Sequence, residues 1–180
     1  GISIMSELRT NRIVPRDGLA SGMSGGIIQV VQSFKTDTGS SSVDGGGLTS
    51  HVLTQSITPT RADSKVLVEF NVMCSSSSTM NRLAAVITRG GSPVGVADDS
   101  GDNMTENTVC ISAPNANEPY MLSGKFLDSP ATTSAVTYGV KIRTGTSSTI
   151  TIQFNRQGTE SNNIYIMRGT SSLTLSEISA

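Results

Sequence analysis

The chain has 180 residues and a mass of 18.7 kDa; 15% of the residues are charged and 4% are aromatic, and the formal net charge is −1. This length fits one domain and excludes a second domain of ordinary size. The balanced charge, without a dense Lys/Arg run, argues against nucleic acid as a partner, and the apolar runs are too short for membrane insertion.

Residues 1–26 differ from the rest, and we interpret them as an N-terminal arm and linker. Residues 6–18 are polar and hold several of the basic residues, and residues 21–26 are small. We expect the arm to dock on a partner subunit or a larger assembly; a frayed terminus is the alternative. No signal-peptide pattern is present. Met5 is a candidate initiator, and residues 1–4 are either the product of an upstream start or an addition made in cloning.

From Ile27 onward, apolar and polar residues alternate with the two-residue period of half-buried strands. The clearest case is the segment around Ile150, Ile152 and Phe154. Residues 36–47 have too little apolar content to bury, and we expect a loop there. Gly90-Gly91 suits a tight hairpin. The predicted strands are Ile27–Phe34, His51–Ile57, Lys65–Cys74, Arg82–Arg89, Asn107–Ser112, Tyr120–Leu127, Ala135–Arg143, Thr149–Asn155, Asn163–Arg168 and Ser172–Ile178.

These elements predict the fold class. About ten short strands with turn residues between them and no amphipathic helix are typical of an all-β protein with antiparallel sheets. The short connections exclude parallel βαβ units. We therefore predict a jelly-roll β-sandwich over residues 27–180.

The sequence offers no convincing catalytic, cofactor or metal site. His51 is the only histidine, and we expect an ordinary surface or capping residue. Asp98, Asp99, Asp102 and Asn103 could meet a calcium ion, but their spacing does not match an EF-hand, and a solvated hairpin tip is the better interpretation. Arg61-Ala62-Asp63 is expected to be a plain turn. For Cys74 and Cys110 we expect buried free thiols, and a disulfide between them stays open.

Some strands carry apolar residues on both faces, which predicts a partner subunit. Leu67 and Met73 lie opposite the expected core face of Lys65–Cys74. Most aromatic residues are expected in the core, but some could line a subunit contact. The predicted interface residues are therefore Tyr138, Tyr165, Leu67 and Met73.

Three segments support a family resemblance. The run of residues 126–138, followed by Lys141-Ile142-Arg143, and the closing residues 171–178 resemble virion-associated proteins of marine phages and large algal viruses. The opening residues 6–15 are similar to the short lead-in of phage fibre proteins. In architecture, the expected jelly roll is also similar to the trimeric domains of the tumour-necrosis-factor and complement C1q families.

The resemblance implies a non-enzymatic structural protein on the virion exterior, such as the head of a tail or capsid fibre, made in the host cytoplasm. It implies a homotrimer, attachment to other virion proteins through the arm, and binding to a host-surface glycan or protein. A carbohydrate-binding module is the alternative, although the absence of Trp argues against it. A fibre-borne polysaccharide depolymerase would need paired carboxylates, and the Glu residues are scattered.

Overall fold

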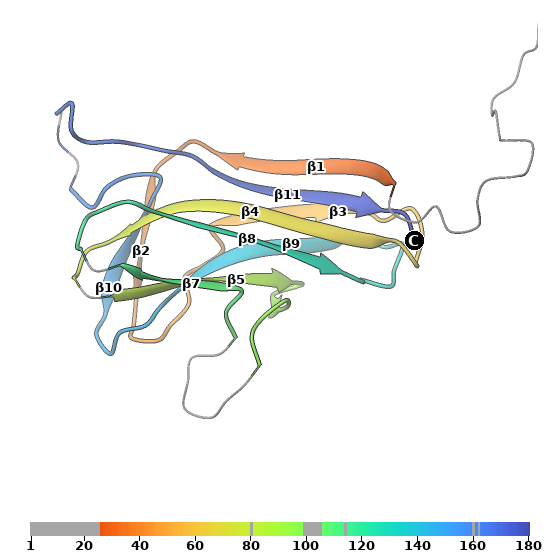
Figure 1. Cartoon of the computed structure of the whole chain (residues 1–180), viewed down its shortest axis with the longest axis horizontal. Helices are drawn as coiled ribbons and strands as arrows, with labels where there is room; N and C mark the ends of the chain where they lie inside the picture. Colours follow the sequence, from red (N-terminus) through yellow and green to blue (C-terminus); the bar gives the residue numbers. More distant parts are fainter. Residues whose placement is uncertain (1–25, 80, 99–105, 114, 160, 162) are drawn as a thin grey trace, which may run out of the picture.

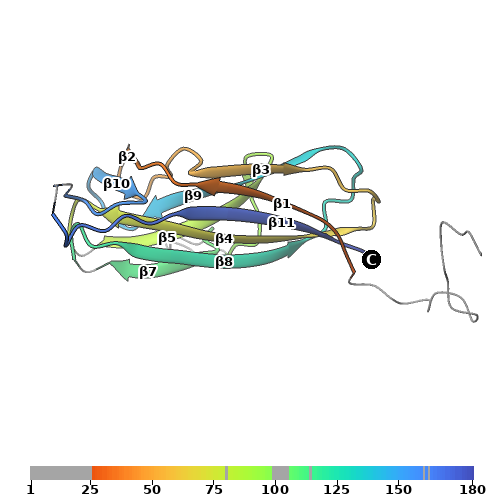
Figure 2. The same ribbon diagram turned by 90° about the horizontal axis from the view of Figure 1, so that it is seen from above.

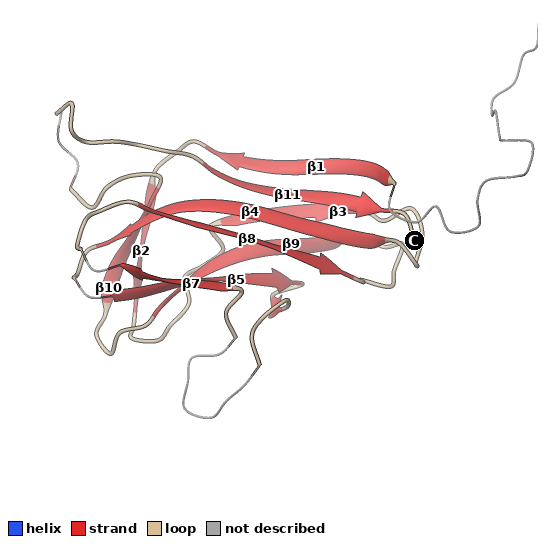
Figure 3. Cartoon of the chain, in the orientation of Figure 1, coloured by secondary structure: helices blue, strands red, loops and turns tan. Residues whose placement is uncertain are grey.

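The computed structural model describes residues 26–79, 81–98, 106–113, 115–159, 161 and 163–180. In this part of the chain the regular secondary structure is all β (Figure 3), and no helix is long and apolar enough to cross a membrane. The strands are β1 (Ile27–Lys35), β2 (Gly39–Val43), β3 (Leu53–Ile57), β4 (Lys65–Ser76), β5 (Asn81–Arg89), β6 (Ser92–Pro93), β7 (Val109–Ala113), β8 (Tyr120–Asp128), β9 (Val136–Thr144), β10 (Ile150–Phe154) and β11 (Ser171–Ile178).

The strands form two antiparallel sheets, which confirms the predicted β-sandwich. Without the short strands β2, β6 and β10, the first sheet reads β1-β11-β4-β8 and the second reads β3-β9-β5-β7. The four strands of the first sheet lie side by side in Figure 1. Figure 2 shows that β1, β11, β4 and β8 run along the long axis of the molecule.

The pairing is nested: β1 pairs with β11, β3 with β9, β4 with β8, and β5 with β7. The chain is thus one long antiparallel ribbon, whose successive strand pairs fall alternately in the two sheets. This topology is the jelly roll.

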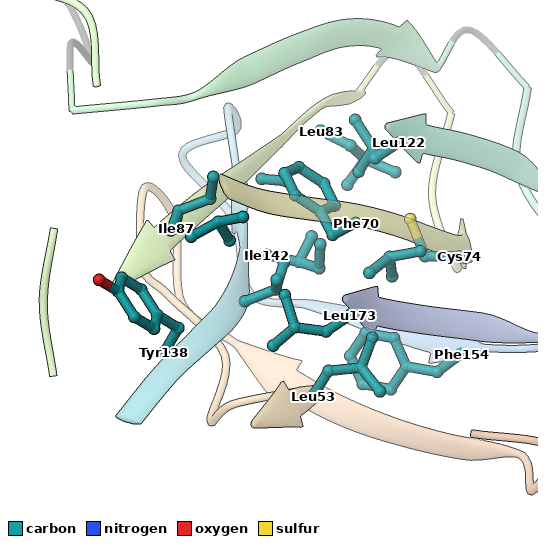
Figure 4. Close-up of a cluster of buried hydrophobic side chains, with 14 of the residues drawn as sticks. Leu53, Phe70, Cys74, Leu83, Ile87, Leu122, Tyr138, Ile142, Phe154 and Leu173 are labelled. Atoms are coloured by element: carbon teal, nitrogen blue, oxygen red, sulfur yellow. The ribbon is translucent and has the colours of Figure 1, made fainter. Parts of the chain in front are cut away.

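Alternation along the strands builds the core between the sheets. On β4, Val66, Val68, Phe70 and Val72 are fully or almost fully buried, while Glu69 and Asn71 between them are exposed. Buried residues from both sheets, including Leu173 of β11 and Ile142 of β9, meet in one cluster (Figure 4). Each fully buried Leu, Ile or Phe contributes about 1.5–3 kcal/mol to folding.

Two features of the sequence prediction are wrong. Gly39–Val43 is strand β2, because it pairs with β10 along its whole length despite its Gly/Ser composition. The segment Asn163–Arg168 is a turn-containing loop, in which the Asn163 side chain accepts a hydrogen bond from the Tyr165 N–H at 3.0 Å and its carbonyl accepts one from the Ile166 N–H.

The hairpin predicted at Gly90-Gly91 is confirmed. The two glycines connect β5 to β6 with φ angles of 57° and 91°. Positive φ at both central residues is the requirement of the two-residue hairpin turn that matches strand twist.

Candidate interaction surfaces

His51 is placed as a structural residue. Its Nε2 lies 2.9 Å from Thr88 Oγ1, which in turn donates to the Gly139 carbonyl. Burial, with a smaller effect of Lys141, lowers the pKa of His51. A Cβ at position 139 would lie 2.4 Å from the imidazole, so the ring packs on bare backbone.

The other sequence candidates bring no chemistry together in the described residues. Within those residues no group of three or more His, Cys, Asp or Glu could hold a metal ion. Of the acidic loop, Asp99, Asp102 and Asn103 lie outside the described residues. Arg61 and Asp63 form a two-point ion pair with distances of 2.9 and 2.6 Å, which holds the pKa of Asp63 below its usual value. Since both side chains are exposed, this ion pair holds the turn locally and contributes little to the stability of the whole protein.

Both cysteines are free, as expected. Cys74 faces the core, and burial raises the pKa of its thiol to about 12. Cys110 on β7 is exposed, so the expectation of burial is wrong for this residue. The strand alternation explains this, because its neighbours Val109 and Ile111 take the inward positions.

Tyr138 is wrong as an interface residue. It has no exposed surface and belongs to the buried cluster (Figure 4). Its hydroxyl donates to Asp128 Oδ2 at 2.6 Å. Burial, together with this bond, raises the pKa of Tyr138 above its usual value. Arg89 Nη1 bonds both carboxylate oxygens of Asp128, at 3.0 and 2.8 Å. The aromatic ring of Tyr138 is part of the core. Its hydroxyl, the Asp128 carboxylate and the Arg89 guanidinium form a hydrogen-bonded cluster at one end of the sandwich.

The other three predicted interface residues lie in different places. Leu67 is partly exposed on the outward side of β4. Met73 is also on that side, but only 8% of it is exposed, because Gly169 packs against its sulfur. Tyr165 is 75% exposed and lies in the β10–β11 loop at the end of the sandwich.

The outward side of β1, β11, β4 and β8, here called the outer sheet face, carries much of the exposed apolar surface. β1 exposes Ile27, Ile28, Val30 and Phe34, and β8 exposes Met121 and Leu127. One row across the four strands consists of Val30, Ser176, Leu67 and Leu127. Edge strand β1 has no strand on its other side in the described residues.

The next row of the outer sheet face is polar and contains Gln32, Thr174, Glu69 and Lys125. Glu69 and Lys125 are cross-strand partners on β4 and β8. They line a shallow depression of about 420 Å³ together with Phe70, Asn71, Ser123 and Gly124.

A second concavity, here called the end pocket, lies between two loops at the end of the sandwich away from the C-terminus. Its volume is about 200 Å³, and it is lined by Ala116, Asn117 and Glu118 of the β7–β8 loop and by Gln157, Thr159 and Ile166 of the β10–β11 loop. A bond from the Gly158 N–H to the Asn117 carbonyl, at 3.2 Å, joins the two loops. Strand periodicity could not reveal this pocket, since two loops far apart in sequence form it.

Comparisons with known proteins give only distant likenesses. No family model matches the sequence, and no curated protein matches it. A structure of infectious bursal disease virus, strain Gx, matches with 15% identity and a TM-score of 0.40 over 92% of this chain and 45% of that chain. The crystal structure of the VP2 subviral particle of the same virus matches with 13% identity and a TM-score of 0.41 over 92% and 43%.

The T13 particle of that virus matches with 12% identity and a TM-score of 0.43 over 92% of this chain and 41% of that chain. This chain thus spans less than half the length of the three chains it matches. TM-scores of this size do not establish a shared fold, and no statement about function follows from them.

Proposed function

We propose that this chain is a non-enzymatic structural protein of a virion and that its jelly roll assembles into a homotrimer through the outer sheet face. The observation that carries the proposal is the apolar surface exposed by β1 and β8. Exposed, long, apolar edge strands are normally covered in native proteins, because their free backbone groups and side chains invite pairing.

The partner we propose is a further copy of the same chain. Glu69 and Lys125 lie next to each other in the outer sheet face, so around a threefold axis Glu69 of one copy can meet Lys125 of the next copy. The formal net charge of −1 adds little repulsion between copies. Leu67 and the exposed residues of β1 would supply apolar contact area, with the polar row fixing the register.

Light scattering on the full chain tests the assembly. We expect a mass of three chains of 18.7 kDa each at micromolar concentration. The double variant Val30→Lys/Phe34→Lys should shift the protein to monomer, since it places charges in the contact. The matched control Thr54→Lys/Ser56→Lys, on exposed positions of edge strand β3 in the other sheet, should leave the trimer intact. A wild-type monomer or dimer contradicts the trimer.

The finer role that we propose is display on the particle exterior as the head of a tail or capsid fibre. Residues 1–26 would connect the jelly roll to other virion proteins. The support is the fold, which recurs in viral capsid proteins but also in lectins and cupins, so it does not decide function alone. Antibodies against residues 27–180 should label intact particles; a chain that stays soluble while particles sediment would contradict the virion location.

A further inference from the structure

The most exposed apolar side chains in the described residues gather at one loop. Ile164, Tyr165 and Met167 have exposed fractions of 86%, 75% and 66%. Between them, Ile166 turns inward and forms an apolar wall of the end pocket. The sandwich therefore presents a concavity with polar lining beside an exposed aromatic and aliphatic surface.

The loop is fixed by hydrogen bonds. Asn163 Oδ1 accepts from the Tyr165 N–H at 3.0 Å, and Gln157 Oε1 accepts from the Met167 N–H at 3.1 Å. The Asn117 N–H donates to the Ser76 carbonyl at 2.8 Å, which attaches the facing loop to β4. Binding to a preformed site of this kind costs little ordering entropy.

Hydrogen bonds also hold the polar side chains of the pocket lining. Glu118 Oε2 is held by Asn115 Nδ2 at 2.8 Å and more weakly by the Tyr120 hydroxyl at 3.4 Å, which leaves Oε1 as an acceptor. Gln157 uses its carbonyl oxygen on the loop, which leaves its Nε2 as a donor. Thr159 adds a hydroxyl to the lining.

We propose that the end pocket binds one neutral pyranose ring of a glycan. Vicinal hydroxyls of a sugar pair with a carboxylate oxygen and a carboxamide N–H, while the C–H face of the ring packs on an apolar or aromatic surface. The volume of about 200 Å³ suits a single ring. Among the described residues that line the pocket, Glu118 is the only charged one, and it disfavours anionic sugars.

The site lies on the end loops and does not use the outer sheet face, so it stands apart from the proposed trimer contact. If the trimer forms, three such sites make weak binding additive. The absence of Trp is no obstacle, because Tyr165, which precedes the pocket residue Ile166 in the chain, is 75% exposed and offers an aromatic ring.

Titration of the ¹⁵N-labelled full chain with methyl pyranosides tests the proposal. The probes are methyl α-mannoside, methyl β-galactoside, methyl N-acetyl-β-glucosaminide and, as an anionic probe, N-acetylneuraminic acid. We expect saturable shifts of residues 116–118, 157–159 and 163–166 with at least one neutral probe, and at least tenfold weaker binding of the anionic one, equal to about 1.4 kcal/mol.

Variants locate the site. Gln157→Glu keeps the oxygen that holds Met167 but removes the donor, and Glu118→Gln keeps an oxygen for Asn115 but removes the charge. Each should weaken binding at least tenfold, and Tyr165→Ala should do the same while Tyr165→Phe does not. A matched control away from both surfaces, Gln55→Glu on strand β3, should bind like the wild type.

The proposal is overturned if no neutral probe binds at millimolar concentration, if shifts map to the outer sheet face, or if the pocket variants bind normally. It is also overturned if N-acetylneuraminic acid is preferred. Thermal unfolding of each variant separates lost binding from lost folding. Light scattering is recorded on the same samples, so failure of the trimer and failure of sugar binding are distinguishable.

Discussion

Buried polar side chains hold the ends of this sandwich together. Asn155, after β10, adopts a positive φ of 57° and is fully buried. Its Nδ2 donates to the carbonyls of Lys35 and Asp37, and its Oδ1 accepts from the Ser171 hydroxyl at 2.6 Å. One side chain thereby satisfies backbone groups between β1 and β2 and also links to the start of β11, where apolar packing ends.

Glu177 has the corresponding role at the other end. It has no exposed surface, and its carboxylate accepts from Gln29 Nε2 at 2.7 Å and from the N–H and hydroxyl of Thr60 at 2.7 and 2.8 Å. Burial alone would raise the pKa of Glu177, but the hydrogen bonds from Gln29 and Thr60 outweigh it and lower the pKa to about 2.

This geometry predicts acid sensitivity. Because the folded pKa of Glu177 is about 2 and the usual value is 4.5, its stabilisation is complete above about pH 5 and is lost as pH falls towards 2. Glu177→Gln should lower the free energy of unfolding by about 1–3 kcal/mol at pH 7. Urea titrations between pH 7 and pH 2.5 should give a flatter pH dependence for the variant. Equal slopes for both proteins would contradict this role.

Sequence periodicity predicted single residues well only where one face of a strand is polar. On Lys65–Ser76 the inward residues were evident, because Glu69 and Asn71 mark the solvent side. Tyr138 was misplaced because a ring with a polar end suits both a core and an interface. What decided its burial was Asp128, a partner ten residues earlier in the sequence that periodicity cannot pair with it.

Most elements were predictable because their alternation is strong, but two depended on tertiary contacts. Strand β2 is Gly39-Ser40-Ser41-Ser42-Val43, whose composition favours a loop; it is a strand because β10 offers it a full ladder. The apolar residues of Asn163–Arg168 suggested a strand, yet the Asn163 turn fixes a loop that exposes them. Neither outcome follows from local propensity. The end pocket, which depends on that loop, was therefore not predictable.

Replacing glycine by alanine should lower the free energy of unfolding by different amounts at Gly90 and at Gly95. An added Cβ at Gly90, with φ of 57°, meets nothing within 4 Å, so Gly90→Ala should cost only the left-handed conformation, about 1–2 kcal/mol. At Gly95, with φ of 61°, the Cβ would lie 2.4 Å from the Phe126 ring. Urea denaturation should show a clearly larger loss for Gly95→Ala. A similar loss at both positions would contradict the packing of Phe126 on Gly95.

At the scale of the whole molecule, the reactivity of the two cysteine thiols tests the fold. Cys110 is exposed and should react with a thiol reagent at once in the native protein. Cys74 is fully buried with a pKa raised to about 12, so it should react only through unfolding. Mass spectrometry should find one modified thiol in buffer and two in denaturant. Rapid double labelling of the native protein, or a disulfide, would contradict the fold.

The nested pairing of the jelly roll also affects how the protein is made. Gln29 of β1 and Glu177 of β11 are bonded partners 148 residues apart in the chain. On the ribosome, β1 is the first strand of the jelly roll to emerge and β11 is the last. Until β11 is made, the first sheet lacks the strand that joins β1 to β4. Contacts of such high sequence separation form slowly, so the incomplete jelly roll exposes apolar residues of β1 for a long time, which favours aggregation of the nascent chain.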